Sequence, residues 1–422
     1  MTGASRLALL GGRAMLEEDL PLHNSIAEEE AAAAMRVLRS GSLSGFYGSA
    51  GENFYGGPEV RRLEAAWCER FQIKHAIAMN SATSCLMAAA AACDLGPGDE
   101  MIVPPFTMIA SATAAKLWSA RAVFADVRAD TFTLDPESVA RCITSRTKAI
   151  MAVNLFGQAA DYDALTALAR RHGLMLIEDN AQAPGALYRG RPAGTLADIG
   201  VFSLNCHKTI QCGEGGVACT NDDGLAEKLR LIRNHGEAVV REIGYANHPE
   251  KLIGFNFRMG ELEAAIAGEQ LAKLDALTAP RRRIAALYDE RLAALPGLTV
   301  PTVGDMRDHV YYVYALRLDA AEAGFSRAQL VAALAAEGVP CFEGYCRPLY
   351  REPLFASDAG SHAGLCPVVG RLYEEELLFH NWLHPEIEPF ADCIADAFEK
   401  VWELTGSVAA IGEGSEPAIR RG

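Results

Sequence analysis

Short apolar runs alternate with helical patterns from Lys74 to Asp222, and this alternation restricts the possible folds more than any other feature of the chain. The expected strands are 75–79, 101–103, 122–125, 149–153, 174–177 and 199–202, and the clearest helices between them are 84–93 and 162–171. Apolar strands separated by helices are typical of a largely parallel sheet buried on both faces. Such a sheet binds ligands at the carboxyl ends of its strands, so the residues that follow each strand are the first candidates for a site.

The pattern changes after Arg258. A long helical stretch over 261–295, interrupted near Pro280, leads into a mixture of strands and helices. The expected elements there are strands at 310–316 and 339–342 and helices at 327–335 and 390–404. We therefore expect a large domain over 1–270, a smaller α/β domain over 271–410 attached through the long helix, and a disordered polar tail over 411–422.

Composition excludes several classes of protein. The 422-residue chain carries a formal net charge of −15, whereas proteins that bind nucleic acid carry a basic surplus. No apolar run reaches the roughly 18 to 20 residues that span a bilayer, and the apolar stretch at the N-terminus is short for a secretion signal. The eleven cysteines are scattered without any C-x-x-C spacing, which predicts neither a metal site nor a disulfide framework. These features indicate a cytoplasmic protein with reduced thiols.

The residues from Phe202 to Gly216 place Lys208 shortly after a predicted strand, with Ser203 upstream and a glycine-rich turn downstream. A lysine that forms a Schiff base with pyridoxal 5'-phosphate (PLP) needs such surroundings: a rigid strand end, a hydroxyl group for the phosphate and a pocket with little water. Burial disfavours the charged ammonium, so such a lysine can act as nucleophile and proton carrier near neutral pH. A single lysine is more often a solvated surface charge, so the neighbouring strand ends must decide between the two interpretations.

Two of those strand ends carry groups that suit a phosphorylated cofactor. The segment from Asn80 to Ser84 follows a strand and opens a helix, where backbone N–H groups and the helix dipole favour an anion. A plain helix cap explains this segment equally well. Asp179 ends another strand, and a carboxylate there can pair with a protonated pyridine nitrogen, although a lone aspartate is more often a turn residue.

Phe106 and Ser203 extend the same set. Phe106 follows two prolines at a strand end and is placed to stack on a flat ring, although such an aromatic is usually part of the core. Ser203 is placed to reach a phosphate from the strand that leads to Lys208. Each signal is weak alone, but their order on one sheet favours a common site.

Taken together, these segments resemble the DegT/StrS-type PLP-dependent sugar aminotransferases, which have the aspartate aminotransferase (type I) fold. The resemblance covers nearly the whole chain and rests on residues 7–12, 104–107, 178–183, 203–216, 254–259 and 348–350. It implies an α/β fold with a large domain around a mostly parallel central sheet and a smaller C-terminal α/β domain. It also implies PLP as the cofactor and a homodimer with shared active sites.

Carried over to this sequence, the resemblance implies a role for each candidate residue. Lys208 is the internal-aldimine lysine, and Asp179 pairs with the pyridine nitrogen. Phe106 stacks on the ring, and Gln182 lies against the ring near its phenolic oxygen. The phosphate is held by Ala82, Thr83 and Ser203, and by Asn256 of the neighbouring subunit.

Three positions bear on the activity. Ala82 stands where many members have glycine, which is tolerable if only its N–H is used, and Gln182 stands where some members have histidine. Position 208 is lysine, whereas the dehydratase branch of the family has histidine there. Transamination is therefore favoured over removal of a sugar hydroxyl.

The expected reaction moves an amino group from L-glutamate or L-glutamine to a keto sugar, which we expect to be nucleotide-linked. Two alternatives stay open: a keto-cyclitol (inosose-type) aminotransferase and a non-catalytic PLP-binding regulatory protein. The intact set of Lys208, Asp179 and Ser203 argues against the second alternative without eliminating it. The sequence leaves the acceptor, the aminated carbon and the choice of donor undetermined.

Two further features are candidates for substrate contacts. A diphosphate would need cations, for which Arg230, Arg233, His235, Lys251 and 281–283 are candidates. The glycine-rich segment 40–57 carries Phe46, Tyr47 and Tyr55 and lacks the pattern of a P-loop or a dinucleotide fingerprint. It is either a flexible connection or a loop that covers the substrate.

Overall fold

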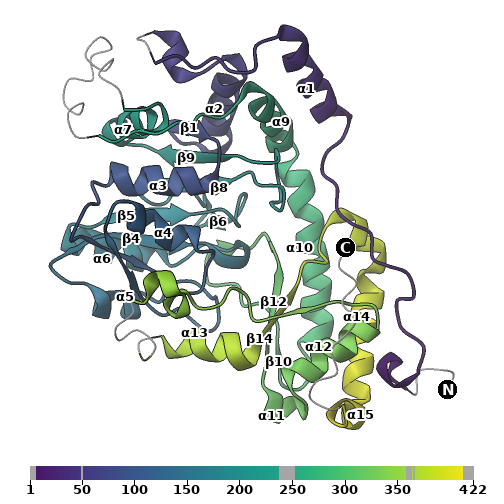
Figure 1. The fold of residues 1–422 in the computed structure, drawn as a ribbon. Helices are drawn as coiled ribbons and strands as arrows, with labels where there is room; N and C mark the ends of the chain where they lie inside the picture. Colours follow the sequence, from purple (N-terminus) through teal and green to yellow (C-terminus); the bar gives the residue numbers. More distant parts are fainter. Residues whose placement is uncertain (1–5, 49–50, 237–251, 358–363, 365, 412–422) are drawn as a thin grey trace.

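A computed structural model describes residues 6–48, 51–236, 252–357, 364 and 366–411 (Figure 1). A seven-stranded sheet forms the centre of the larger part, and a four-stranded sheet forms the centre of the smaller part. Residues 412–422 of the predicted tail, and Lys251, lie outside the described residues. Within the described part of the chain, no helix combines the length and the apolar character needed to cross a membrane.

The seven-stranded sheet confirms the predicted α/β architecture. Its strands follow the order β1-β9-β8-β5-β4-β2-β3, and all neighbours are parallel except where β9 pairs with β1 and β8. Their bounds are His75–Met79 (β1), Glu100–Val103 (β2), Arg121–Phe124 (β3), Thr147–Val153 (β4), Met175–Asp179 (β5), Ile199–Ser203 (β8) and Gly216–Thr220 (β9). The carboxyl ends of β1, β2, β4, β5 and β8 therefore lie at one edge.

Apolar side chains on both faces hold this sheet between two layers of helices. In β2, Met101 and Val103 enter one core cluster while Ile102 enters another, as the alternation of a strand requires. The first face is covered by α3 (Ala82–Ala92), α4 (Ala110–Leu117) and α7 (Asp223–Arg233). The second face is covered by α2 (Pro58–Phe71), α9 (Glu261–Ala272), α5 (Pro136–Cys142) and α6 (Tyr162–His172).

The long helical stretch after Arg258 breaks at Lys273 and not near Pro280. Helix α9 ends at Ala272, and α10 (Leu274–Leu292) contains Pro280. The N–H of Lys273 donates to Gln270 at 3.1 Å, and its ammonium pairs with Glu30 of α1 (Glu28–Ser40) at 2.8 Å. Contacts with the N-terminal helix thus fix a bend that the local sequence alone does not signal.

The smaller part is built on a mixed layer of strands and helices. Its sheet has the order β10-β12-β14-β13, with all neighbours antiparallel. The bounds are Leu298–Thr299 (β10), Tyr314–Leu318 (β12), Phe342–Glu343 (β13) and Leu377–His380 (β14), with helices α11 (Ala320–Ala323), α12 (Arg327–Ala336), α13 (Pro367–Arg371), α14 (Ala391–Glu403) and α15 (Thr405–Ala409). A third, three-stranded sheet joins β11 (Arg307–Asp308) to β6 (Leu187–Tyr188) and β7 (Arg191–Pro192).

The N-terminal segment packs on the smaller part although it precedes the larger one in sequence. Leu7 and Leu20 are buried in the core cluster of the small sheet. Lys400 of α14 pairs with Glu337 and also donates to the carbonyl of Arg13 at 2.7 Å. Figure 1 shows this purple segment running along α10 and α14 toward α15. The division of domains at residue 270 remains a prediction, and the N-terminal segment spans both sides of it.

Candidate active site

The carboxyl ends of two strands meet beside Gly216, the first residue of β9. Gly216 pairs with Met79 at the end of β1 and with Ser203 at the end of β8. Two strands further on lies Asp179, the last residue of β5. The order of strands therefore gathers the predicted phosphate group, the predicted carboxylate and the segment that leads to Lys208 at one edge.

The start of α3 offers unpaired backbone donors at this edge. Ser81 caps the helix, its Oγ accepting from the N–H of Ser84 at 3.0 Å. The N–H groups of Ala82 and Thr83 stand in the first turn and have no acceptor among the described residues. A side chain at Gly216 would collide with the backbone of Ser81 and Ala82, so glycine lets β9 approach this turn closely. The arrangement suits an anion.

Asp179 is buried and hydrogen-bonded at both carboxylate oxygens. Ser111 of α4 donates to Oδ2 at 2.8 Å, and the N–H of Ala181 donates to Oδ1 at 3.1 Å. Burial raises the pKa of Asp179, and these two hydrogen bonds and the positive charge of Lys208 oppose that rise without cancelling it. A buried carboxylate of this kind gains from a cationic partner, such as a protonated ring nitrogen.

Lys208 lies in a turn after β8 and is half-buried. Its backbone N–H donates to Asn205 at 2.9 Å, and its Nζ lies 4.8 Å from the ring centroid of Tyr312. It forms no ion pair with any carboxylate in the described part of the chain. Its charge nevertheless acts on Asp179 and on the thiol of Cys346. The amine is thus held near a carboxylate without being neutralised by a direct contact.

Gln182 and Phe106 are buried beside a segment of the smaller part. Gln182 accepts from the N–H of Phe156 at 2.8 Å and donates to the hydroxyl of Tyr345 at 2.7 Å. Phe106 is fully buried, with edge-on contacts to Tyr345 and Phe156 at centroid distances of 5.7 and 6.5 Å. The contact of Gln182 and Phe106 with a cofactor ring stays a prediction.

Asn256 is exposed on this chain, close to the start of α3. Its carbonyl accepts from the side chain of Asn80 at 3.5 Å, and its Oδ1 accepts from Arg258 at 2.8 Å. The exposed side chain is available to a neighbouring subunit, so its predicted contact with the partner's phosphate remains a proposal.

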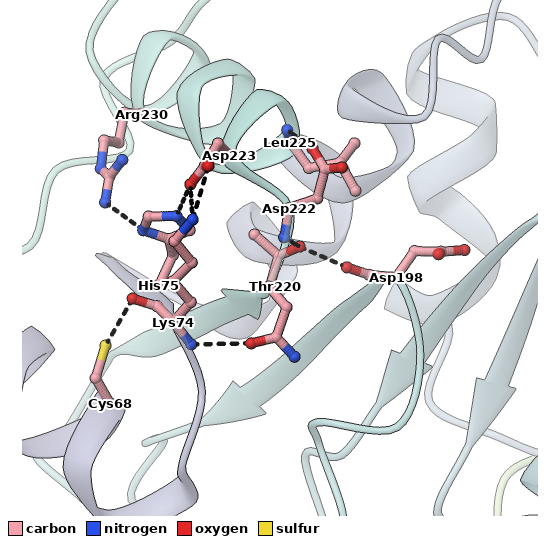
Figure 2. Close-up of polar contacts among 10 residues, drawn as sticks. Cys68, Lys74, His75, Asp198, Thr220, Asp222, Asp223, Leu225 and Arg230 are labelled. Carbon is pink, nitrogen blue, oxygen red and sulfur yellow. Dashed lines mark hydrogen bonds and ion pairs between the residues drawn. The ribbon is translucent and has the colours of Figure 1, made fainter.

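Two of the predicted cations are engaged elsewhere. Arg230 donates to His75 at 3.3 Å, and His75 also lies 2.6 Å from Asp223, in a network at the amino end of β1 that Figure 2 shows. Arg233 is fully buried and pairs with Glu64. The position of Arg230 contradicts a role in the cleft, because the strand ends that form the site lie at the opposite edge of the sheet. Arg233 lies near the carboxyl end of β1, where it donates to the carbonyl of Ala78 at 3.1 Å, but its guanidinium is buried among protein partners.

The arginines of 281–283 also have protein partners. Arg281 and Arg282 donate to backbone carbonyls within residues 309–312, and Arg283 pairs with Glu388 at 2.7 Å. These arginines therefore connect α10 to residues 309–312 and to Glu388. His235 is exposed, and its N–H donates to Phe255 at 3.0 Å.

The glycine-rich segment is anchored, which contradicts the interpretation as a flexible connection for its described residues. Phe46 and Phe54 are buried, and Phe46 lies under the guanidinium of Arg233 at 4.7 Å. The carbonyl of Tyr47 accepts from Asn234 at 3.0 Å, while the Tyr47 side chain is 60% exposed. Tyr47 is thus an exposed aromatic of the kind that a substrate-covering loop requires, and that role stays a prediction.

Several residues of the site escaped the sequence analysis. Ser111, in the first turn of α4, orients Asp179 and also forms a hydrogen bond with Thr107 at 3.1 Å. In the sequence, the only indication was the spacing of four residues between these two hydroxyl side chains, which places them on the same side of a helical turn. Tyr312 and Tyr345 come from the smaller part and reach the site only through the packing of distant segments. No local pattern marks them.

The described groups fit one type of ligand. Free N–H groups and Ser203 suit a phosphate, Asp179 suits a protonated ring nitrogen, and the amine of Lys208 suits an aldehyde. A phosphorylated pyridine aldehyde combines these three features.

Comparison with known proteins agrees with this arrangement. Residues 25–396 match the DegT/DnrJ/EryC1/StrS aminotransferase family. The GDP-perosamine synthase of Caulobacter vibrioides is 42% identical over 260 residues, which are 61% of this chain and 69% of that protein. The dTDP-3-amino-3,4,6-trideoxy-alpha-D-glucose transaminase of Streptomyces venezuelae is 36% identical over 81% of this chain and 84% of that protein.

A solved structure extends the comparison to three dimensions. S. venezuelae DesV, determined in complex with a ketimine intermediate, superposes with a TM-score of 0.78 at 34% identity. The match covers 89% of this chain and 95% of DesV. The fold predicted from the sequence is therefore confirmed.

Proposed function

We propose that this chain, which belongs to the DegT/DnrJ/EryC1/StrS aminotransferase family, aminates a keto sugar linked to a nucleoside diphosphate. Family membership makes the chain an aminotransferase of amino-sugar biosynthesis. The observation that carries the proposal is the unpaired amine of Lys208 beside the buried carboxylate of Asp179. Nucleotide linkage is supported by two relatives whose names contain a GDP- and a dTDP-sugar.

The cofactor in this proposal is PLP, as in the PLP-dependent enzymes of this family. The N–H groups of Ala82 and Thr83, with Ser203, would hold its phosphate, and Asp179 would face its ring nitrogen. Phe106 and Gln182 would flank its ring. Bound PLP supplies an electron sink that makes a C–H bond of the amino donor acidic.

The protein groups have separate tasks in the reaction. Lys208 Nζ takes a proton from the α-carbon of the donor and returns one to the acceptor, acting as general base and then as general acid. The ring of Tyr312 lies 4.8 Å from Nζ of Lys208 and keeps this atom near the site. Asp179 would pair with the ring nitrogen of the cofactor, and Ser111 and the N–H of Ala181 hold its two carboxylate oxygens in place.

The donor in this proposal is L-glutamate or L-glutamine, and the assembly is a homodimer in which Asn256 of each subunit completes the other's phosphate site. We place the enzyme in the cytoplasm. All eleven cysteines are free in the structure, which supports a reducing compartment.

A spectrum and a substrate screen test the proposal. The purified holoenzyme should lose its visible PLP absorbance when L-glutamate or L-glutamine is added, and a K208A variant should not respond. The absorbance should return on addition of a keto-sugar nucleotide. Recovery with free inososes alone would instead identify a cyclitol enzyme, and retention of the band with every donor would favour a non-catalytic PLP-binding protein.

A further inference from the structure

Two histidines and a glutamate converge where the N-terminal segment crosses the smaller part. His23 comes from the segment before α1, and His384 and Glu386 come from the start of the short helix η8 (Pro385–Phe390). Oε2 of Glu386 lies 2.9 Å from Nδ1 of His23 and 2.9 Å from Nδ1 of His384. The two imidazole rings are stacked, with centroids 5.2 Å apart. The cluster shares no residue with the candidate active site.

The backbone on both sides of the cluster is fixed by packing. Leu383 and Ile387 flank His384 and Glu386 and are fully buried, and the N–H of Ile387 donates to the carbonyl of His384 at 2.9 Å. Leu20, three residues before His23, is buried in the same core cluster. The carbonyl of Ser25, two residues after His23, accepts from Gln270 at 2.8 Å. The three side chains are therefore placed together by the fold itself.

The donor atoms match a borderline divalent cation. Two imidazole nitrogens and one carboxylate oxygen form a His2Glu set, which suits zinc, whereas magnesium and calcium prefer oxygen ligands alone. The three candidate ligand atoms all lie within 4.8 Å of one another. Ligand atoms of a tetrahedral zinc ion are about 3.3 Å apart, given bonds of about 2.0–2.1 Å, so binding needs only small shifts of the side chains.

The charges around the cluster are compatible with a cation. His384 is buried, and its Nδ1 lies 2.9 Å from the carboxylate of Glu386. The positive charge of the nearby Arg281 guanidinium disfavours a cation at the cluster, and the negative charge of the Glu386 carboxylate offsets this effect.

We propose that His23, His384 and Glu386 bind one Zn²⁺, or another borderline divalent ion, per chain. Water would take the remaining position, on the side where Glu386 is 37% and His23 21% exposed. The ion would join side chains 363 residues apart and fasten the N-terminal segment to the smaller part. Because the unfolded chain lacks this arrangement, the ion would stabilise the folded chain by mass action.

The competing explanation is a hydrogen-bond cluster without metal, in which each histidine donates its Nδ1–H to Glu386. Both explanations predict a loss of stability when a member is replaced. They differ in metal binding, which is therefore the quantity to measure.

Calorimetric titration of the chelator-treated holoenzyme with zinc chloride tests the proposal. We expect one zinc per chain and a rise in the melting temperature on binding. H23Q and E386Q should bind zinc more than about 100-fold more weakly. H172Q, which replaces an exposed histidine at the end of α6, should bind like the wild type. These variants keep all eleven cysteines, so a loss confined to H23Q and E386Q cannot arise from the thiols.

Two results would overturn the proposal. One is a wild-type protein that binds no zinc, and the other is zinc binding by H23Q and E386Q at wild-type affinity. PLP absorbance and far-ultraviolet circular dichroism identify a variant that has lost its fold. If only one of H23Q and E386Q folds, the zinc affinity of that variant is the test.

Discussion

Asp179 combines a strong requirement for charge with an environment that disfavours charge. Burial raises its carboxyl pKa in the folded chain, so between the unfolded and folded pKa values the folded chain binds the proton more tightly. Stability must then fall as the pH rises through that interval. Asp179 therefore lowers the stability of the cofactor-free protein at neutral pH, which a bound cation at the ring nitrogen would offset.

The D179N substitution tests whether the charge of Asp179 lowers the stability of the cofactor-free protein. The cofactor-free variant should be at least as stable as the wild type at pH 7, and its advantage should shrink as the pH falls toward about 4, the ordinary range of an aspartate. Activity should nevertheless be lost. Chemical denaturation across pH checks the first part. An advantage that grows at low pH would contradict the sign of the shift.

The hydroxyl of Tyr345 is the second residue-scale test, because it joins the smaller part of the molecule to Gln182. Y345F leaves a buried amide donor of Gln182 unpaired, which should lower the free energy of unfolding by about 1–3 kcal/mol. Denaturant unfolding measures the change. Among the described residues the hydroxyl of Tyr373 makes no hydrogen bond, so Y373F should lower the free energy of unfolding much less. If the two variants lose the same free energy of unfolding, the hydrogen bond between Tyr345 and Gln182 does not stabilise the fold as we expect.

At the scale of elements, the meeting of β9 with α3 depends on one glycine. A methyl group at position 216 would collide with the backbone of Ser81 and Ala82 and displace the free N–H groups of the first turn. G216A should therefore weaken PLP binding by about tenfold or more, since overpacking costs about 1–3 kcal/mol. Equilibrium dialysis of PLP measures the effect.

Gly268 supplies the matched control for G216A. It lies inside α9 with open space around its α-carbon. G268A should leave the PLP affinity unchanged and stabilise the helix by about 0.5–1 kcal/mol. A loss of PLP affinity in G268A equal to that in G216A would show that the effect is not specific to the contact with α3.

Six strands of the central sheet were predictable, with ends that differ from the structure by at most two residues. These strands are buried on both faces, so their residues are apolar throughout and can be recognised from the sequence alone. Strand β9 was missed because Gly216–Thr220 directly follows a glycine-rich turn and pairs antiparallel between β1 and β8. The bend at Lys273 was misplaced because contacts with α1 fix it.

At the scale of the whole molecule, the site depends on contacts between distant segments. That Lys208, Asp179 and Ser203 lie at one edge of the sheet was predictable, because the carboxyl ends of parallel strands share an edge, while their roles stay a prediction. Tyr312, Tyr345 and the partners of the predicted arginines were not, because each depends on how the smaller part and the helices dock. The cluster of His23, His384 and Glu386 could not be predicted either, because it forms only when the N-terminal segment packs on the smaller part.

The proposed homodimer with shared active sites can be tested with mixed dimers. K208A and N256A should each be impaired as homodimers, the first in chemistry and the second in phosphate binding. A mixed dimer regains one intact site if Asn256 acts on the partner's phosphate. Random mixing should then restore up to about one quarter of wild-type activity, because half of the dimers are mixed and each has one good site. No recovery in verified mixed dimers would place Asn256 within its own subunit's site.

In the proposed function, the amine of Lys208 carries PLP and releases it when an amino donor arrives. Borohydride reduction followed by peptide mass spectrometry tests this directly, because reduction fixes a Schiff base to the lysine that holds it. We expect a pyridoxyl group on Lys208 in the resting enzyme and its disappearance when L-glutamate or L-glutamine is added before reduction. A pyridoxyl group on another lysine, or one on Lys208 that persists with both donors, would contradict the proposed role of Lys208.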